Sequence, residues 1–323
     1  MIQRRAHDLR ADVYLRRWLM LLAALSALGF AGASLRGGHS TVSNAASSGP
    51  ASKGQTAHVA PSPPPLLSVS GPGSTSASWT VVARVRGRPA AWLAQRSGVT
   101  LMRFDQALVR LDLHAGSTDG GTVGWKYGDQ ISAGEIHRIL AAFNGGFKLT
   151  HASVGFTSGG RVAVPVKQGL ASIVTYTDGT SDVGRWGGSV PSPGKPIYSV
   201  LQNLSLLVDH RAPAANVECV SCWGETIGHR TVVARSGVGI TAAGQLVWAG
   251  GEQLLPGELA SALVRAGAVR GIELDINPDW VAAYLYVHHS GGPTAEPVVP
   301  GQVGIAGRLL EPYSRDFLTV VAR

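Results

Sequence analysis

Cysteine is scarce in this chain of 323 residues, and its scarcity narrows the kinds of site that it can form. The only two cysteines are Cys219 and Cys222, spaced C-x-x-C. A zinc site would need two further ligands, for which His210 and His229 are the nearby candidates. A redox site would need a helix N-terminus behind the motif, which the following residues do not clearly supply. The pair therefore favours a local disulfide, as in proteins of oxidising compartments.

Charge and aromatic side chains are also sparse, at 15% and 7% of the residues. The net charge of +8 falls to +4 when residues 1–36, with six Arg and two Asp, are set aside. Basic residues are not interleaved with aromatic ones, so the composition does not indicate a nucleic-acid partner. The mild positive excess fits retention on an anionic envelope.

Other familiar patterns are missing. The chain shows no internal repeat, and Ser236 does not stand in a Gly-x-Ser-x-Gly motif, which excludes a nucleophile elbow there. The ten histidines are scattered. His288 and His289 precede Ser-Gly-Gly, which indicates a surface loop rather than a pair of ligands.

One long uncharged apolar run is present, at residues 18–35, behind a basic segment at residues 1–17. As a helix the run would be about 27 Å long, at the short edge of what spans a bilayer. The preceding arginines fit a cytoplasmic N-terminus. We therefore expect a single-pass protein of the cell membrane with its domain outside the cytoplasm. The alternative is a signal sequence cleaved near residues 31–33 (Ala-Gly-Ala), which would give a secreted protein.

Composition divides the rest of the chain into two parts. Residues 36–78 are rich in Ser, Pro, Ala, Gly and Thr and contain almost no large apolar side chain. Such a stretch cannot bury a core, so we expect a disordered stalk. Residues 79–323 are enough for one large domain.

Within residues 79–323, short apolar or alternating runs bounded by Gly, Pro and charged residues predict strands. Asp178-Gly179 and Ala243-Gly244 are hairpin signals between such runs. The predicted strands are residues 80–85, 91–94, 99–104, 108–113, 170–176, 199–208, 232–241, 245–249 and 272–277, with one more near Val183.

Two helices are predicted among these strands. The first begins at Ser132, whose capping box with Glu135 precedes an apolar stripe at Ile136, Ile139 and Leu140. The second begins near residue 256, a proline, and ends before a glycine at residue 267. The domain is therefore expected to be α+β, with a mixed or largely antiparallel sheet and two or more packed helices.

The most informative stretch is residues 271–280 (Gly-Ile-Glu-Leu-Asp-Ile-Asn-Pro-Asp-Trp). Strict alternation places Glu273, Asp275 and Asn277 on one face of a strand, and the following proline moves Asp279 and Trp280 onto a turn. A solvated sheet face would explain the polar row. However, acidic residues are depleted in strands, and like charges two residues apart repel, so a functional site is the sharper interpretation.

A second unusual segment is residues 143–148 (Phe-Asn-Gly-Gly-Phe-Lys). Gly145 and Gly146 allow a ligand to approach the backbone closely. Asn144 offers a donor and an acceptor, and Lys148 offers a positive charge for a phosphate or carboxylate. The alternative is a plain tight turn.

Three polar residues interrupt apolar strands. Arg235 must pair or reach a cleft, because burying an isolated guanidinium is costly. A structural ion pair with Glu273 or Asp275 is one alternative for it. Gln202 and Asn203 either face a ligand or form hydrogen bonds within the core.

The order of these segments resembles the phosphodiester glycosidase family, whose members include the "uncovering" enzyme that removes N-acetylglucosamine from a phosphodiester. The resemblance covers roughly residues 135–320. It implies site roles for Asn144, Gly145, Gly146, Arg235 and Asp275. The chain departs from the family's glycine run and serine after the aspartate, since residues 276–280 stand there, and it is similar to a branch with Leu-Asp-Ile-Asn-Pro-x-Trp.

The resemblance implies an exported hydrolase that cleaves a glycosidic or glycosyl-phosphodiester bond in a polysaccharide or sugar-phosphate substrate. Asp275 is the first candidate for the catalytic carboxylate, with Glu273 or Asp279 as its partner. No cofactor is required, although a divalent cation between the carboxylates is compatible with the sequence. The rival hypothesis is a non-catalytic glycan-binding or scaffold protein that retains the fold. The residues expected to bind substrate are Asn144, Gly145, Gly146, Lys148, Gln202, Asn203, Arg235, Asn277 and Trp280.

Overall fold

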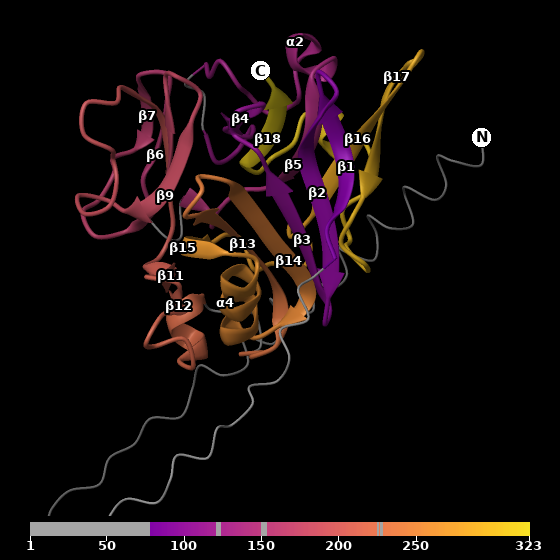
Figure 1. Ribbon diagram of the computed structural model, residues 1–323. Coiled ribbons are helices and arrows are strands. Elements are labelled where there is room, and N and C mark those ends of the chain that lie inside the picture. Colours follow the sequence, from indigo (N-terminus) through magenta and orange to yellow (C-terminus); the bar gives the residue numbers. More distant parts are fainter. Residues whose placement is uncertain (1–77, 121–123, 150–153, 225, 227–228) are drawn as a thin grey trace, which may run out of the picture. The chain divides into compact units, whose positions relative to one another are not determined.

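The computed structural model describes residues 78–120, 124–149, 154–224, 226 and 229–323, which belong to one compact unit (Figure 1). The basic segment, the apolar run at 18–35 and the stalk up to residue 77 lie outside the described residues. In the described part of the chain no helix is long and apolar enough to cross a membrane. The described residues therefore give no support to the expected single-pass membrane protein, whose anchor at residues 18–35 lies outside them.

Antiparallel strand pairing dominates the structure, and the described strands form three sheets. The largest has eight strands, most of them joined by tight turns. In spatial order it contains β1 (Thr80–Val85), β2 (Arg88–Arg96), β3 (Val99–Phe104), β14 (Leu246–Leu254), β13 (Val233–Thr241), β15 (Ala268–Glu273), β11 (Leu206–Asp209) and β12 (Ala212–Pro213).

The other two sheets have five strands each. One contains β17 (Gly292–Pro297), β16 (Ala283–His289), β5 (Ile139–Asn144), β18 (Phe317–Ala322) and β4 (Val109–His114). The other contains β7 (Arg161–Val164), β6 (Phe156–Ser158), β10 (Ile197–Gln202), β8 (Ala171–Tyr176) and β9 (Ser181–Arg185).

Helix is confined to short pieces. Helix α4 (Pro256–Arg265) packs on β13 and β14 (Figure 1), and its proline start and the glycine at 267, with φ of 96°, are as predicted. The other helical elements in the described part of the chain are α2 (Ala133–Ile136) and the 3-10 turns η1 (Val220–Trp223) and η2 (Arg308–Leu310). The predicted α+β class is therefore wrong, because the described residues form a mostly β structure with one well-packed helix.

The helix predicted from Ser132 fails after one turn. Its capping hydrogen bonds form, since the Ser132 amide donates to Glu135 Oε2 at 3.1 Å. However, Ile139 and Leu140 belong to β5, whose six residues are all buried and whose two edges pair with β16 and β18. A continuous apolar run is compatible with a helix and with a buried strand. Here the segment is a strand because its backbone forms hydrogen bonds with a neighbouring strand on each side.

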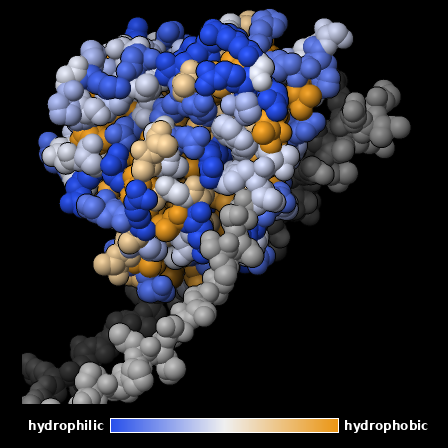
Figure 2. Space-filling view, viewed as in Figure 1, coloured by the Kyte–Doolittle hydropathy of each residue, from blue (hydrophilic) through white to orange (hydrophobic). Residues whose placement is uncertain are grey.

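One apolar core joins the three sheets. Phe143 of β5 lies 6.0 Å from Trp248 of β14, measured between ring centroids, and Leu201 of β10 belongs to the same cluster. Burying each such side chain contributes on the order of 2 kcal/mol. The core therefore fixes the end of β5 against the eight-stranded sheet, where the candidate site lies. The surface in Figure 2 is mostly hydrophilic, with small apolar patches between polar residues.

Candidate functional site

Three chain segments meet where β5 ends. The amide of Asp275, just past β15, donates to the carbonyl of Gly145 at 3.1 Å. The amide of Gly145 in turn donates to the carbonyl of Asp316, just before β18, at 3.0 Å. The predicted strand 272–277 therefore stops at Glu273, because its backbone leaves the eight-stranded sheet and turns to β5. Side chains 271–276 are all buried, so the alternative of a solvated face is also wrong.

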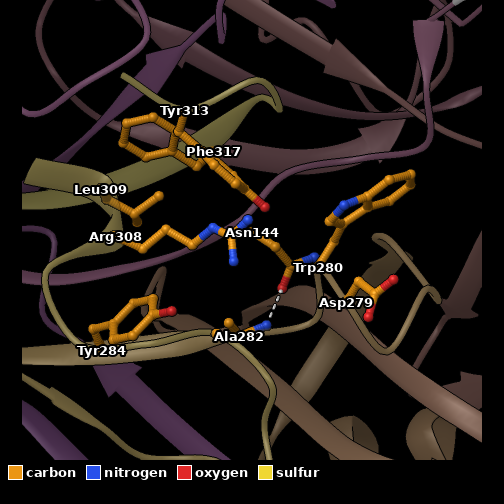
Figure 3. Close-up of a pocket in the computed structure, with 10 residues that line it drawn as sticks. Asn144, Asp279, Trp280, Ala282, Tyr284, Arg308, Leu309, Tyr313 and Phe317 are labelled. Carbon is orange, nitrogen blue, oxygen red and sulfur yellow. Dashed lines mark hydrogen bonds between the residues drawn. The ribbon is translucent and has the colours of Figure 1, made fainter. Parts of the chain in front are cut away.

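Asn144 and Asp275 are brought together by a residue that the sequence analysis set aside. Asn144 Nδ2 donates to Ser236 Oγ at 2.9 Å, and Ser236 Oγ donates to the carbonyl of Asp275 at 3.1 Å. Asn144 Oδ1 accepts from the amide of Ala282 at 3.4 Å, the bond drawn in Figure 3. This chain of bonds fixes the amide side chain, so Asn144 holds the site together.

Arg315 is the cation at the centre of the site. Its Nη2 donates to Asp275 Oδ2 at 3.0 Å and to the carbonyl of Gly146 at 2.8 Å, while Nη1 pairs with Asp119. The side chains of Arg315 and Asp119 are 5% and 4% exposed. A buried guanidinium that bridges two buried carboxylates compensates charges that would otherwise be costly.

Burial sets the protonation of the carboxyl groups around Arg315. It raises the pKa of Asp275 to about 6, against the opposing pull of the Arg315 guanidinium. It likewise raises the pKa of Asp316 to about 7, although the amide of Gly146 donates to Asp316 Oδ2 at 2.9 Å. Asp275 can therefore hold or release a proton near neutral pH, as an acid–base group must.

The turn after Asp275 uses its polar atoms internally. The amide of Asn277 donates to Asp275 Oδ1 at 2.8 Å, and Asn277 Oδ1 accepts from the amide of Asp279 at 2.9 Å. Asn277 thus acts as a turn residue of the kind that Asn favours. Asp279 is exposed.

Two cations lie close to the ring of Trp280. The Lys148 ammonium is 4.6 Å and the Arg315 guanidinium carbon 4.4 Å from the centroid of its ring. Both distances are within the range of cation–π attraction. Lys148, from the segment after β5, and Trp280 are therefore adjacent to the Arg315 network.

A small pocket opens beside Asn144 (Figure 3). The Arg308 side chain extends toward Asn144, and Asp279 and Trp280 line the opposite side. The cavity volume is about 10 Å³, which corresponds to roughly one water molecule. A cavity of this volume is too small for a ring-sized ligand.

Glu273 and Arg235 lie apart from this network and pair with each other. Arg235 Nη1 donates to Glu273 Oε1 at 2.7 Å and to the carbonyl of Trp223 at 2.9 Å, while Nε donates to the carbonyl of Leu254 at 3.1 Å. Both side chains are fully buried. Burial raises the pKa of Glu273, and the Arg235 guanidinium opposes this. The alternative interpretation of Arg235, a structural ion pair with Glu273, is therefore the one that the structure shows.

Gln202 and Asn203 are fully buried and bonded within the core. Gln202 Oε1 accepts from the amide of Lys167 at 2.7 Å, and its Nε2 donates to Ser172 Oγ at 3.0 Å. Asn203 Nδ2 donates to the carbonyl of Glu273 at 2.7 Å. The structure therefore places neither amide on a surface that a ligand reaches.

Cys219 and Cys222 form a disulfide at η1. Among the described residues no group of three or more His, Cys, Asp or Glu is placed to hold a metal ion. The cation found among the site's carboxylates is Arg315, and a divalent ion there stays a hypothesis.

Sequence reasoning missed Asp119, Arg308, Arg315 and Asp316. The adjacent opposite charges of Arg315 and Asp316 directly before an apolar strand were the available signal. Asp119 precedes a glycine pair and looks only like a turn residue.

No protein-family model and no curated protein matches the chain. Among solved structures, the catalytic domain of zebrafish N-acetylglucosamine-1-phosphodiester alpha-N-acetylglucosaminidase, auto-inhibited by its pro-peptide, is similar with a TM-score of 0.47 at 14% identity, over 78% of this chain and 89% of that one. A hypothetical protein from Synechocystis matches with a TM-score of 0.40 at 12% identity, over 74% of this chain and 63% of that one. A protein from Burkholderia pseudomallei K96243 matches with a TM-score of 0.33 at 12% identity, over 72% and 75% of the two chains. These similarities are distant.

Proposed function

We propose that this protein is an exported hydrolase that cleaves a glycosidic or glycosyl-phosphodiester bond, with Asp275 as its general acid. The observation that carries the proposal is the buried Asp275 carboxyl, whose pKa is raised to about 6 beside the Arg315 guanidinium. Glycoside cleavage needs a group that is protonated at working pH and delivers its proton to the leaving oxygen. The sequence resemblance to phosphodiester glycosidases supports the same reaction class.

The other roles follow from position. Asp279 is exposed at the pocket and serves as the second carboxylate, whereas Glu273 is held by Arg235 inside the protein. Arg308 lines the pocket and Lys148 lies over the ring of Trp280, which also lines it, so these two cations would hold a phosphate or carboxylate. Trp280 would pack against the sugar. The Cys219–Cys222 disulfide supports an oxidising, extracytoplasmic compartment.

A second candidate is a glycan-binding protein without turnover. Two observations favour it: both Asp275 oxygens already accept hydrogen bonds within the protein, and the pocket has room for about one water molecule. A working acid must expose one oxygen to the leaving group. Under this candidate the Arg315 network is purely structural.

Turnover by the purified protein separates the two candidates. Wild type, Asp275→Asn and the matched control Asp105→Asn are assayed on p-nitrophenyl glycosides and on the methyl diester of N-acetylglucosamine 1-phosphate. The hydrolase proposal expects turnover by wild type and control and a loss of at least about 100-fold in Asp275→Asn. Full activity in Asp275→Asn contradicts the acid role. A folded wild type that binds a saccharide saturably but turns over none of the probes favours the second candidate.

A further inference from the structure

A second hollow of about 670 Å³ lies between β4, β8 and β10, and helix α2 and Arg323 contribute to its wall. Among the described residues it shares no lining residue with the pocket beside Asn144. The surface near α2 is predominantly hydrophilic in Figure 2. We call this hollow the β4 groove.

Each acidic side chain of the β4 groove already has a donor. The three carboxylates accept hydrogen bonds of 2.7 to 2.9 Å from side chains of the same region. Asp112 and Asp178 are thus paired with cations, whereas Glu135 bonds to a neutral hydroxyl and, through Oε1, to His114 Nε2 at 3.0 Å. The pairs are Asp112 with Arg110, Glu135 with Ser132, and Asp178 with Lys195.

Three cations of the β4 groove have no such carboxylate. Lys126 lies over two aromatic rings, 5.1 Å from the centroid of Tyr127 and 5.6 Å from that of Tyr198. Arg323 donates to main-chain carbonyls, and Arg138 is exposed beside α2. Within the described part of the chain none of the three forms an ion pair. The groove therefore carries a net positive field that favours an anionic ligand.

The side chains also indicate the kind of anion. Base stacking needs free ring faces, but Lys126 covers the two tyrosines, and Tyr127 is 9% exposed. What the β4 groove offers is guanidinium and ammonium groups with the exposed hydroxyls of Ser132 and Thr177. Guanidinium binds phosphate and carboxylate, and hydroxyls bond to sugar hydroxyls.

We propose that the β4 groove binds an acidic saccharide, separately from the Asp275 site and whether or not that site is catalytic. Lys126, Arg138 and Arg323 bind the acid groups, and the hydroxyl side chains bind the sugar. An extended polymer fits an open groove of this size better than a single anion does. The site is therefore one for holding a charged glycan chain.

Binding by the full chain tests the proposal. The probes are polygalacturonate for carboxylate, a phosphomannan for phosphate, neutral dextran and a single-stranded oligothymidylate, titrated calorimetrically at low and at physiological salt. The variants are Lys126→Gln/Arg138→Gln and, as a control with the same charge change, Arg185→Gln/Arg211→Gln. All of the substituted side chains are exposed or partly exposed, so both proteins should fold.

We expect saturable binding of at least one acidic polysaccharide, no binding of dextran, and an affinity loss of at least about tenfold in Lys126→Gln/Arg138→Gln with a smaller salt dependence. The control should bind as wild type does, and Lys126→Gln/Arg138→Gln should give the wild-type result in the hydrolase assay, which separates the two sites. Equal losses in both double variants would show attraction by net charge alone. That outcome, the absence of acidic-polysaccharide binding, or stronger binding of oligothymidylate overturns the proposal.

Discussion

Arg315 Nη2 lies 3.0 Å from Asp275 Oδ2, and this contact links the segment before β18 to the segment after β15. Through Nη1 the same guanidinium pairs with Asp119, and its Nη2 is 3.6 Å from Asp316 Oδ1. The Arg315 guanidinium thus forms ion pairs with three carboxylates that are nearly inaccessible to solvent. The arrangement makes Arg315 a stability determinant as well as a part of the site.

Replacing Arg315 by Met should lower the free energy of unfolding by about 3–5 kcal/mol at neutral pH. The loss arises because the carboxylates would be left buried without their cation. Urea denaturation followed by circular dichroism measures it, with the exposed Arg211→Met as a control expected to change by no more than about 0.5 kcal/mol. The deficit should shrink in mild acid, where the carboxyls take up protons. A deficit under about 1 kcal/mol would show that the network does not stabilise the fold.

The two glycines after Asn144 should differ in their tolerance of a methyl group. A Cβ on Gly145 would collide with the Asp316 carboxylate, whereas a Cβ on Gly146 would meet Leu201 Cδ1 at an ordinary 3.5 Å. Gly145→Ala is therefore expected to lose about 1–3 kcal/mol or more of stability, and Gly146→Ala less than about 1 kcal/mol. Thermal and urea unfolding of the two variants provide the comparison. Equal losses of stability in the two variants would mean that Asp316 can move away from a side chain at position 145 at little cost.

Local patterns in the sequence were sufficient to predict many of the strands, two hairpins and one helix. The first four predicted strands, the hairpins at Asp178-Gly179 and Ala243-Gly244, and α4 are all present, because alternation, turn residues and caps act over short distances. The class was wrong because the run beginning at Ile139 is apolar in every position. Only its long-range pairing with β16 and β18 made it a strand.

The candidate site could be predicted only in part, again because some of its contacts join residues far apart in the sequence. Asn144 and Asp275 stood out because polar residues adjoined glycines or an apolar strand, and they do lie together through Ser236. The local signals at Arg315 and Asp119 do not reveal that the two side chains meet, since their contact joins residues 196 apart in sequence. Alternation suggested that Glu273 and Asp275 share one polar face, but the backbone turn after Glu273 separates their partners.

Glu273 should prove to be structural. Glu273→Gln would leave the Arg235 guanidinium charged and without a carboxylate in a fully buried place, with an expected loss of about 3–5 kcal/mol. An Arg235→Met/Glu273→Leu double variant should recover most of that loss, because apolar residues of similar size often replace a buried ion pair without a penalty. Denaturant unfolding of the single and double variants gives the coupling between the two residues. A stable Glu273→Gln protein that had lost turnover would instead return Glu273 to the catalytic candidates.

The free energy of unfolding should fall as pH rises through the pKa of Asp275, because the buried carboxyl then loses its proton. Its pKa is raised in the folded protein from 3.8 to about 6, so between these values the folded state binds more protons than the unfolded state. The stabilising contribution of the protonated group is therefore fully present below about pH 4 and is lost as pH rises through about 6. One such group changes the slope by at most about 1.4 kcal/mol per pH unit.

Unfolding free energies of wild type, Asp275→Asn and Asp316→Asn across pH 4 to 8 test this assignment. Asp275→Asn should flatten the dependence between about pH 4 and 6. Asp316→Asn should flatten it up to about pH 7, because the pKa of Asp316 is raised to about 7. If Asp275 is the acid in hydrolysis, kcat of the wild type should also decline above about pH 6, since only the protonated form donates. A stability profile that Asp275→Asn leaves unchanged would mean that Asp275 does not titrate in this range, and the general-acid role would lose its physical basis.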